Sequence, residues 1–212
     1  MPPTPIELVC FDLGGVLLRI ADSWDDAIQR VGLLDAIPNN RFHHQASFHD
    51  THHRFERGEI DSTDYTRRVA ALAGLSPSHV LAILDAWLVE PYPGIDPLLD
   101  QLDLASVQTA CLSNTNTIHW HAIMSPGATF LPLHRLGHRF ASPFVGCRKP
   151  DATIYQHVQD QTAVEPESIL FFDDTPDNVH AATARGWLGH RIDPSDDPVA
   201  QVTEHLRHHN VL

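Results

Sequence analysis

Three short apolar runs along the chain are built alike, each of strand length and each followed by turn or capping residues and a helical pattern. They occupy residues 6–11, 107–112 and 169–172. Runs of this kind without polar alternation are typical of strands buried on both faces of a parallel sheet. We expect two further strands, one around Phe144-Val145 and one over residues 187–192. This alternation of strands and helices predicts an α/β fold, with a doubly wound parallel sheet and right-handed crossovers.

Residues 19–90 show a different, wholly helical pattern. Ser23 is a candidate N-cap, Asp61 or Ser62 can begin a second helix, and Ser76 precedes a proline at the first helical position of a third. A Pro- and Gly-rich turn then marks the return to the core pattern. The pattern predicts an all-helical cap over residues 19–90, inserted into an α/β core made of residues 1–18 and 91–212.

Composition and charge narrow the class of protein. Fourteen Lys and Arg face 27 Asp and Glu among 212 residues, so the net charge of −13 argues against a nucleic acid partner. No apolar run reaches the 18 residues of a membrane span, and the amino terminus lacks the basic region of a signal peptide. Cys10, Cys111 and Cys147 are odd in number and far apart, unlike a disulfide framework. We expect a cytoplasmic protein with no membrane partner, a monomer rather than an oligomer.

Chemically active side chains follow the three apolar runs. Asp12 follows the first, Ser113 the second and Asp173-Asp174 the third, while Lys149 precedes a helix that begins with proline. Each residue type is common in turns and caps when taken singly. Ligands of open α/β sheets bind beyond the carboxyl ends of the strands, so these groups are expected on one rim. Their coincidence there indicates a functional site.

The carboxylates of this rim suit phosphoryl transfer. Asp12 can attack phosphorus and form an aspartyl-phosphate. Asp173 and Asp174 are hard oxygen ligands that, with Asp12, can hold Mg²⁺ against a substrate phosphate. The cation is needed because a carboxylate and a phosphate dianion repel each other.

The remaining groups can bind the phosphoryl oxygens. Ser113, Asn114 and the backbone amides after the second run can donate hydrogen bonds to them. Lys149 supplies a compact positive charge for the same oxygens and for the transition state. The predicted substrate-binding residues are therefore Ser113, Asn114 and Lys149, and the predicted catalytic residues are Asp12 and Lys149.

Four segments in order resemble the motifs of the haloacid dehalogenase superfamily: Phe11-Asp12-Leu13-Gly14-Gly15-Val16-Leu17, Leu112-Ser113-Asn114-Thr115-Asn116, Arg148-Lys149-Pro150 and Phe171-Phe172-Asp173-Asp174. The resemblance covers the whole core, and the insert resembles the helical cap of one branch. Residues 56–60 and 149–158 are most similar to the bacterial α-D-glucose-1-phosphate phosphatase group. The resemblance implies a Mg²⁺-dependent phosphatase acting on a small phosphorylated metabolite, of which a sugar phosphate is the expected type.

The resemblance also implies roles for single residues. Asp12 would be the nucleophile and a metal ligand, and the backbone carbonyl of Gly14 a second ligand. Asp174 would bind the metal directly, with Asp173 supporting it or binding through water. Most phosphatases of this family carry a second Asp two residues after the nucleophile, as acid and base, where this chain has Gly14, as the glucose-1-phosphate phosphatase group does. Either another group transfers the proton, or the substrate needs little help, or activity is weak.

Two other functions stay open at this point. A 2-haloacid dehalogenase would displace halide without metal, and Gly14 suits it because halide needs no proton. The pair Asp173-Asp174 opposes that interpretation, because adjacent acids repel without a cation. A catalytically weak module that binds a phosphorylated metabolite is supported by Gly14 alone.

The predicted cap holds further candidates. His49 and His53 are spaced i, i+4 in a His-rich tract and can share a helix face as metal ligands, or they can belong to a solvated polar face. A cap histidine facing the site could replace the missing acid. Four more residues are candidate substrate contacts, with a structural role equally open for each: Arg19, Trp24, Arg54 and Arg57.

Overall fold

A five-stranded, all-parallel sheet lies at the centre of the core in the computed structural model, which describes residues 4–35, 37, 41–125 and 131–212. The strand order is β5-β4-β1-β6-β7, with β1 in the middle. The strands are β1 (Leu8–Phe11), β4 (Gln108–Ser113), β5 (His138–Ala141), β6 (Ile169–Asp173) and β7 (Leu188–Arg191). The predicted fold class is confirmed.

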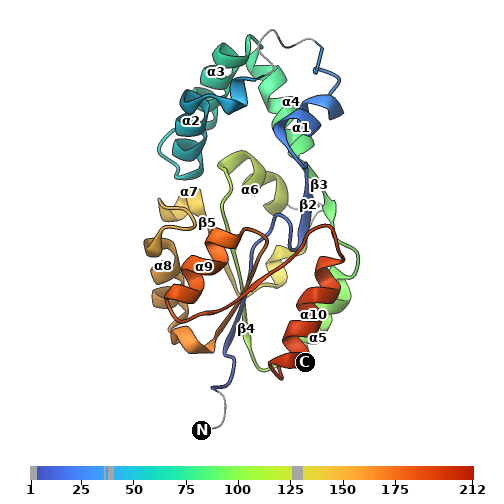
Figure 1. The fold of residues 1–212 in the computed structure, drawn as a ribbon, viewed down its shortest axis with the longest axis vertical. Coiled ribbons are helices and arrows are strands. Elements are labelled where there is room, and N and C mark those ends of the chain that lie inside the picture. Colours follow the sequence, from blue (N-terminus) through green and yellow to red (C-terminus); the bar gives the residue numbers. More distant parts are fainter. Residues whose placement is uncertain (1–3, 36, 38–40, 126–130) are drawn as a thin grey trace.

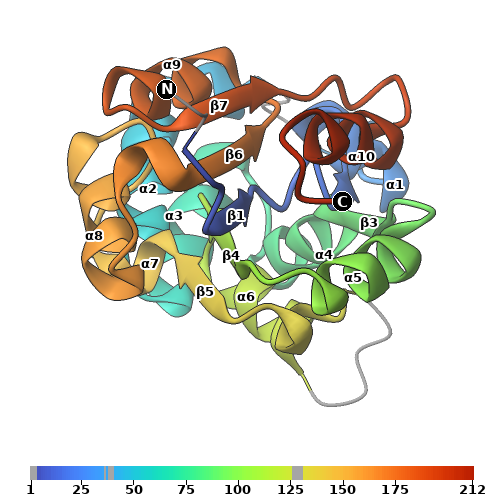
Figure 2. The same ribbon diagram turned by 90° about the horizontal axis from the view of Figure 1, so that it is seen from below.

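Helices cover both faces of this sheet (Figure 2). On one side lie α5 (Ile95–Leu104), α6 (Thr117–Met124) and α10 (Pro198–His208), and on the other α8 (Ala152–Thr162) and α9 (Pro176–Ala184). Alternate residues of β1 divide between the two sides: Val9 and Phe11 pack with α5 and α10, Leu8 and Cys10 with α8 and α9. All four are fully buried, as expected for a central parallel strand.

The strand predicted around Phe144-Val145 is wrong. These residues belong to a short helix, α7 (Ser142–Val145), because Pro143 cannot donate to a strand ladder and suits the first turn of a helix. The strand lies just before it, where β5 pairs Ala141 with Ser113 of β4. Its amino-terminal half at the sheet edge is polar and partly exposed, so it lacks the continuous apolar run of the inner strands.

The helices between residues 24 and 87 form a separate layer at one end of the molecule (Figure 1). It contains α1 (Trp24–Arg30), η1 (Phe42–His44), α2 (Ala46–Glu56), α3 (Ser62–Ala73) and α4 (Pro77–Trp87). Ser23, Asp61 and Ser76 cap α1, α3 and α4 through their side chains, as the sequence predicts. These helices bury a hydrophobic cluster of their own, distinct from those of the sheet.

A two-stranded antiparallel ribbon joins this helical layer to the sheet. It pairs β2 (Leu18–Ile20) with β3 (Leu88–Pro91), so the chain enters and leaves the layer side by side. The layer faces the carboxyl ends of the parallel strands (Figure 1), where ligands of such sheets bind. The two short helices of the core not yet named are η2 (Leu133–Arg135) and η3 (Pro166–Ser168).

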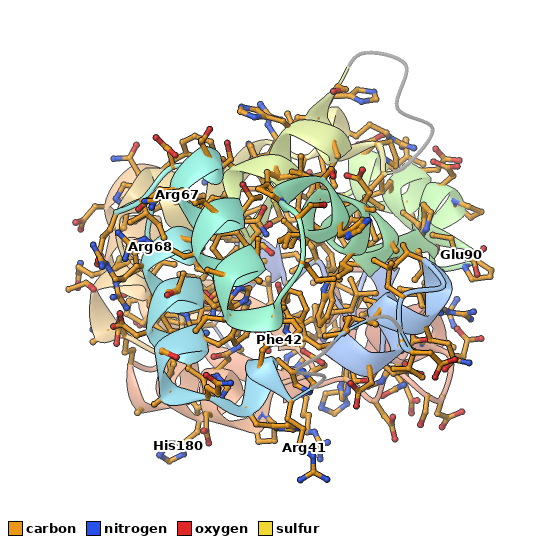
Figure 3. The ribbon with its side chains drawn as sticks, turned by 90° about the horizontal axis from the view of Figure 1, so that it is seen from above. Arg41, Phe42, Arg67, Arg68, Glu90 and His180 are labelled. Atoms are coloured by element: carbon orange, nitrogen blue, oxygen red, sulfur yellow. The ribbon has the colours of Figure 1, made fainter. Side chains whose placement is uncertain are left out.

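The outer face of the helical layer is charged. Viewed from above, Arg67 and Arg68 lie on the outer side of α3, and Arg41 projects away from the molecule (Figure 3). Both arginines of α3 pair with Asp64 on the same helix. Among the described helices, none alone is long and apolar enough to cross a membrane; α3 and α4 pass only when joined, and they are bent by 103°.

Candidate active site

The ends of the two central strands bring three carboxylates together. Asp12 follows β1, Asp173 ends the neighbouring β6, and Asp174 comes next. Each contributes an oxygen atom that lies within 4.8 Å of those of the other two. The backbone N–H of Asp12 extends the ladder by donating to the carbonyl of Phe172 at 2.8 Å. The sheet register therefore sets the spacing of the acidic cluster.

Lys149 lies against two of these acids. Its Nζ is 3.0 Å from Oδ2 of Asp12 and 2.6 Å from Oδ2 of Asp173, and the side chain is fully buried. Burial alone would lower the pKa of Lys149, but the charges of Asp12 and Asp173 outweigh it and raise the pKa. The lysine is thus a permanent positive charge on the floor of the site.

Asn114 fixes the backbone of this lysine from the end of β4. Its Nδ2 donates to the Lys149 carbonyl and its Oδ1 accepts from the Lys149 N–H, both at 2.8 Å. Asn114 was expected to donate to phosphoryl oxygens through its side chain, but the structure uses this side chain to hold the lysine loop. Ser113, the last residue of β4, is buried on the same rim.

Asp173 is the most heavily engaged of the three acids. Besides Lys149, it accepts hydrogen bonds from the backbone N–H of Thr175 at 2.9 Å and from Nδ2 of Asn178 at 3.0 Å. Asp174 is half-buried and accepts a 3.3 Å hydrogen bond from the hydroxyl of Thr175. The adjacent acids therefore differ in how much of each carboxylate is left for a ligand.

The charges at this cluster suit a divalent cation. Burial raises the pKa of Asp12 to about 7 against the opposing pull of Lys149, and burial followed by the charge of Asp173 raises that of Asp174. Three carboxylates facing one ammonium leave two negative charges when all are ionised. A hard cation with oxygen ligands, such as Mg²⁺, would balance them and keep Asp12 ionised at neutral pH. The residues present fit this metal.

The two glycines after Asp12 differ in what surrounds them. Gly15 has φ +72°, and a Cβ there would lie 2.7 Å from Cγ of Asp174, so only glycine lets the turn approach this acid. A Cβ on Gly14 would lie 3.1 Å from Cδ1 of Ile20, on β2. An apolar side chain thus occupies the space beside residue 14, where most phosphatases of the family that the motifs resemble carry an acid.

A small cleft of about 190 Å³ lies between the helical layer and the sheet. Its apolar lining comes from the helices and the ribbon: Ile20, Trp24, Leu84 and Trp87. Its polar lining comes from α2 and from the loop and helix after β4: His52, Glu56, Asn114, Thr115, Asn116 and His119. Trp24 was a candidate substrate contact in the sequence, and the structure places it on this cleft.

Most polar groups of the cleft after β4 are occupied within the protein. Asn116 caps α6, and its Nδ2 lies 3.0 Å from Nδ1 of His119. Nε2 of the same histidine lies 2.9 Å from the Leu84 carbonyl, which only an N–H can satisfy. The Thr115 N–H donates to Oγ of Ser142. These groups are paired with other protein atoms, so they stabilise the wall of the cleft and are not available to bind a ligand.

His52 and Glu56 enter the cleft from one face of α2. His52 Nδ1 lies 2.9 Å from the hydroxyl of Tyr65, and its ring stacks on Phe48. Burial lowers the pKa of His52 to about 3, so the ring is neutral at pH 7. Glu56 is 8% exposed, and burial raises its pKa against the charge of Arg148. A cap histidine was expected to face the site, and His52 is the one that lines this cleft.

Glu56 also links the helical layer to the core. Its Oε2 lies 2.9 Å from Nε of Arg148, the residue before the active-site lysine, although the two atoms are not aligned as a hydrogen bond. Two residues further on, Gly58 has φ +70°, and a Cβ there would lie 2.3 Å from the carbonyl oxygen of Pro143 in α7. Glycine therefore permits the close seating of α2 over the core.

The other candidates of the sequence lie away from this cleft. Arg19 lines a second, larger groove of about 490 Å³ beside Asp174, where it pairs with Glu90 at 3.1 Å. Arg54 and Arg57 both pair with Glu59 on the surface. Among the described residues, His49 and His53 do not join a cluster of three potential metal ligands; the acidic cluster of Asp12 is the only such group.

Sequence reasoning missed Asn178 and Ser142 and did not single out His52 or Glu56 among the charged cap residues. Asn178 follows Asp173 by five residues, which places it in the first turn of a helix that begins after the strand. This spacing could have identified Asn178 as a candidate partner of Asp173 from the sequence. Glu56 was noticed only as part of the segment 56–60, and nothing local indicates that its side chain reaches Arg148.

Comparison with known proteins agrees with this geometry. The family model of haloacid dehalogenase-like hydrolases matches residues 6–186. The chain is 28% identical over 191 residues to the sesquiterpene phosphatase astK of Aspergillus oryzae, a match that covers 88% of this chain and 89% of that protein.

Two solved structures share the fold. A HAD-like family hydrolase from Porphyromonas gingivalis has a TM-score of 0.81 and 23% identity, over 96% of this chain and 99% of that one. A HAD family enzyme from Bacteroides thetaiotaomicron, solved with magnesium and inorganic phosphate, has a TM-score of 0.74 and 23% identity, over 91% of this chain and 96% of that one. Since the family model spans residues 6–186, most of the chain, the chain belongs to the haloacid dehalogenase-like hydrolases.

Proposed function

We propose that this hydrolase is a Mg²⁺-dependent phosphatase that cleaves a small phosphate monoester through an aspartyl-phosphate. The observation that carries the proposal is the buried contact of Lys149 with Asp12 and Asp173 beside a third acid, Asp174. The arrangement offers a nucleophile, a fixed cation and carboxylate ligands for a metal at one point. In the relative from Bacteroides thetaiotaomicron, magnesium and phosphate are bound together, which supports the same chemistry here.

In this proposal Asp12 attacks the phosphorus atom and the bond between phosphorus and the ester oxygen breaks. The ester oxygen leaves as an alkoxide, which takes up a proton from water. Water then attacks the phosphorus of the aspartyl-phosphate, which releases phosphate and restores the carboxylate. Lys149, Ser113 and the backbone amides after β4, other than the Thr115 N–H that donates to Ser142, bind the phosphoryl oxygens while charge develops on them. Asn114 contributes by holding Lys149 in place.

Asp12, Asp174 and the backbone carbonyl of Gly14 would hold the metal, with Asp173 in support. We favour Asp174 as the direct ligand because Asp173 already engages Lys149, Thr175 and Asn178. When bound, the metal neutralises the repulsion between the nucleophile and the phosphate dianion. Asp177, in the first turn of α9, favours the helix amino terminus.

We further propose that residues 19–90 act as a cap over a core made of residues 1–18 and 91–212. The separate hydrophobic cluster of the helical layer and the two-stranded ribbon support this division. The cleft between the two parts would receive the leaving group. Its volume of about 190 Å³ is small for a ligand site, which favours a small phosphorylated metabolite.

A sugar phosphate is the substrate type that we propose first, from the resemblance of segments 56–60 and 149–158 to glucose-1-phosphate phosphatases. The relative astK is named for sesquiterpene phosphates, and the apolar lining by Trp24, Leu84 and Trp87 favours such an apolar ester as the second candidate. The dehalogenase alternative is disfavoured because three clustered carboxylates need a cation that halide displacement does not use. The remaining alternative, a weak binding module, keeps the pocket without turnover.

The test is a phosphate-release assay on purified protein. With Mg²⁺, p-nitrophenyl phosphate should be hydrolysed, and chelation of the metal should stop the reaction. No chloride should be released from 2-chloropropionate. Metal-independent halide release would establish the dehalogenase instead, and phosphate-ester binding without release would establish the binding module.

A further inference from the structure

Two polar atoms on α2 line this cleft without a hydrogen-bond partner among the described residues. Nε2 of His52 and Oε1 of Glu56 stand 3.7 Å apart on successive turns of α2. This separation is too long for a direct hydrogen bond. Neither atom has a hydrogen-bond partner among the residues that the structure describes, whereas Asn114, Asn116 and His119 are engaged as set out above.

The tautomer of His52 defines the chemistry of the pair. Its hydroxyl and the ring of His52 share a 2.9 Å hydrogen bond at Nδ1. If Nδ1 carried the proton, the lone pair of Nε2 would face the carboxylate of Glu56, and the two would repel each other. The favoured tautomer therefore accepts from Tyr65 at Nδ1 and presents an N–H at Nε2. One donor and one acceptor then stand side by side in the cleft.

A hydroxyl group fits between them. A hydroxyl oxygen can lie about 2.8 Å from two atoms that are 3.7 Å apart, accepting from the imidazole N–H and donating to the carboxylate. An alkyl group placed there would leave Oε1 of this buried carboxylate without a hydrogen-bond donor, although Oε2 keeps its ion pair with Arg148, and an unpaired buried oxygen is costly. The half-buried Arg148 beside Oε2 keeps Glu56 in place, so the carboxylate cannot turn out to water without breaking the ion pair.

We propose that His52 and Glu56 bind a hydroxyl group of the leaving alcohol, so that the substrate is a phosphate ester of a polyol rather than of a hydrocarbon. The inference rests on the proposed phosphatase function and deepens it by choosing between its two substrate types. Trp24 and Trp87, whose rings lie 5.2 Å apart, would pack against the carbon skeleton of a sugar ring. Discrimination arises because an ester without the hydroxyl leaves both polar groups unpaired.

The test compares two esters of equal ring size, α-D-glucose 1-phosphate and cyclohexyl phosphate, by the ratio of their kcat/KM values. The main variant is His52→Phe/Tyr65→Phe, which keeps the ring packing on Phe48 and removes the buried hydrogen bond from both sides. Tyr65→Phe alone is the control, because it loses the same hydrogen bond but keeps the imidazole. Glu56→Gln is compared with Glu59→Gln, an exposed glutamate on the same segment.

Wild type should prefer the sugar ester, and the double variant and Glu56→Gln should each lower the ratio by about ten- to a hundredfold, the loss of a hydrogen bond to a buried polar or charged group. Both controls should keep the wild-type ratio. p-Nitrophenyl phosphate has no hydroxyl group for His52 and Glu56 to bind. Its hydrolysis by the wild type and the four variants therefore tests the phosphatase function separately from the hydroxyl contact. An unchanged ratio in the variants, or a wild-type preference for cyclohexyl phosphate, overturns the inference.

Binding separates the two claims further. In an Asp12→Asn background, the ratio of the dissociation constants for the same two esters reports on the hydroxyl contact without turnover. A selective ratio that collapses on Glu56→Gln supports the contact even if no phosphate is released by the unmodified protein. Equal affinities for the two esters in this background overturn it even if the phosphatase assay succeeds.

Discussion

The side chain of Ile20 stands beside the backbone of Gly14, with its Cδ1 3.1 Å from the position that a Cβ would take. Most phosphatases that this chain resembles carry an acid at this position to protonate the leaving group. Here the chain has no side chain at residue 14, and a branched aliphatic group from the ribbon fills the neighbouring space. In the proposed mechanism the departing oxygen would therefore meet an apolar side chain where those phosphatases supply a proton.

The first prediction follows from this contact. Without an acid at residue 14, the rate of phosphate release should depend steeply on leaving-group acidity, as long as chemistry limits turnover. Aryl and anomeric sugar phosphates should be much better substrates than primary alkyl phosphates such as glucose 6-phosphate. A graded series of phosphate esters measures the slope, and a flat series would reveal another proton donor.

The same contact dictates how the missing acid should be restored. Gly14→Asp alone places its Cβ 3.1 Å from Ile20, so the matched variant is Gly14→Asp/Ile20→Ala, with Ile20→Ala as the control. The double variant should flatten the leaving-group dependence and help poor leaving groups most. If the slope stays the same while the new aspartate is shown to be accommodated, the absence of an acid is not its cause.

The second prediction concerns the nucleophile. Asp12→Asn keeps the shape of the side chain but removes the attacking charge, so turnover should fall by several orders of magnitude. The fold should survive, because Lys149 keeps its 2.6 Å contact with Asp173. Phosphate release by the variant is the measurement, with circular dichroism as the control. Retained activity would exclude the covalent route.

The third prediction separates the two acids at the end of β6. Asp174→Asn should raise the Mg²⁺ concentration needed for half-maximal activity, because it weakens a direct ligand. Asp173→Asn should instead lower thermal stability, because it leaves the buried Lys149 with one acid partner and disturbs Thr175 and Asn178. Metal titrations and melting curves of both variants measure the two effects. Identical behaviour of the variants would contradict the assignment.

The fourth prediction concerns acid stability and His119, which is 7% exposed. Burial lowers the pKa of this side chain to about 4, from 6.5 in the unfolded chain. The unfolded state then binds more protons between pH 6.5 and 4, so this histidine should lower stability as the pH falls through that range, by about 3 kcal/mol in all. Urea unfolding at several pH values measures the effect. His119→Asn should flatten this part of the profile, whereas His121→Asn on the exposed side of α6 should leave it unchanged.

Much of the core could be predicted because its strands are buried on both faces. Val9, Cys10 and Phe11 form an apolar run with no polar alternation, and Asp12 then marks the rim. β5 could not be found in the same way, since an edge strand such as His138–Ala141 is half polar, and the apolar pair that follows belongs to a helix. The local sequence therefore predicts a strand reliably only where both faces of that strand are buried.

The candidate site divides along similar lines. Asp12, Asp173 and Lys149 were predicted to meet because parallel strands align their carboxyl ends, and the structure brings them within hydrogen-bonding distance. The contacts of Glu56 could not be predicted, because its partner Arg148 is far along the chain and the packing of α2 on the core decides the pairing. The local sequence predicts which residues end a strand, but it does not predict which residues meet where the helical layer packs on the core.

The double hydrogen bond between Asn114 and the backbone of Lys149 has a consequence for the rate rather than for the structure. In water, the dipoles around a reacting phosphate must rotate as charge moves, and this reorganisation is a large part of the barrier. The backbone of Lys149 is fixed by Asn114 and its ammonium group is buried against two carboxylates, so its charge does not have to reorient during the reaction. Asn114→Ala should therefore slow turnover although the lysine and its charge remain. Without Asn114 the backbone of Lys149 is less fixed, so the ammonium would have to reorient during each reaction.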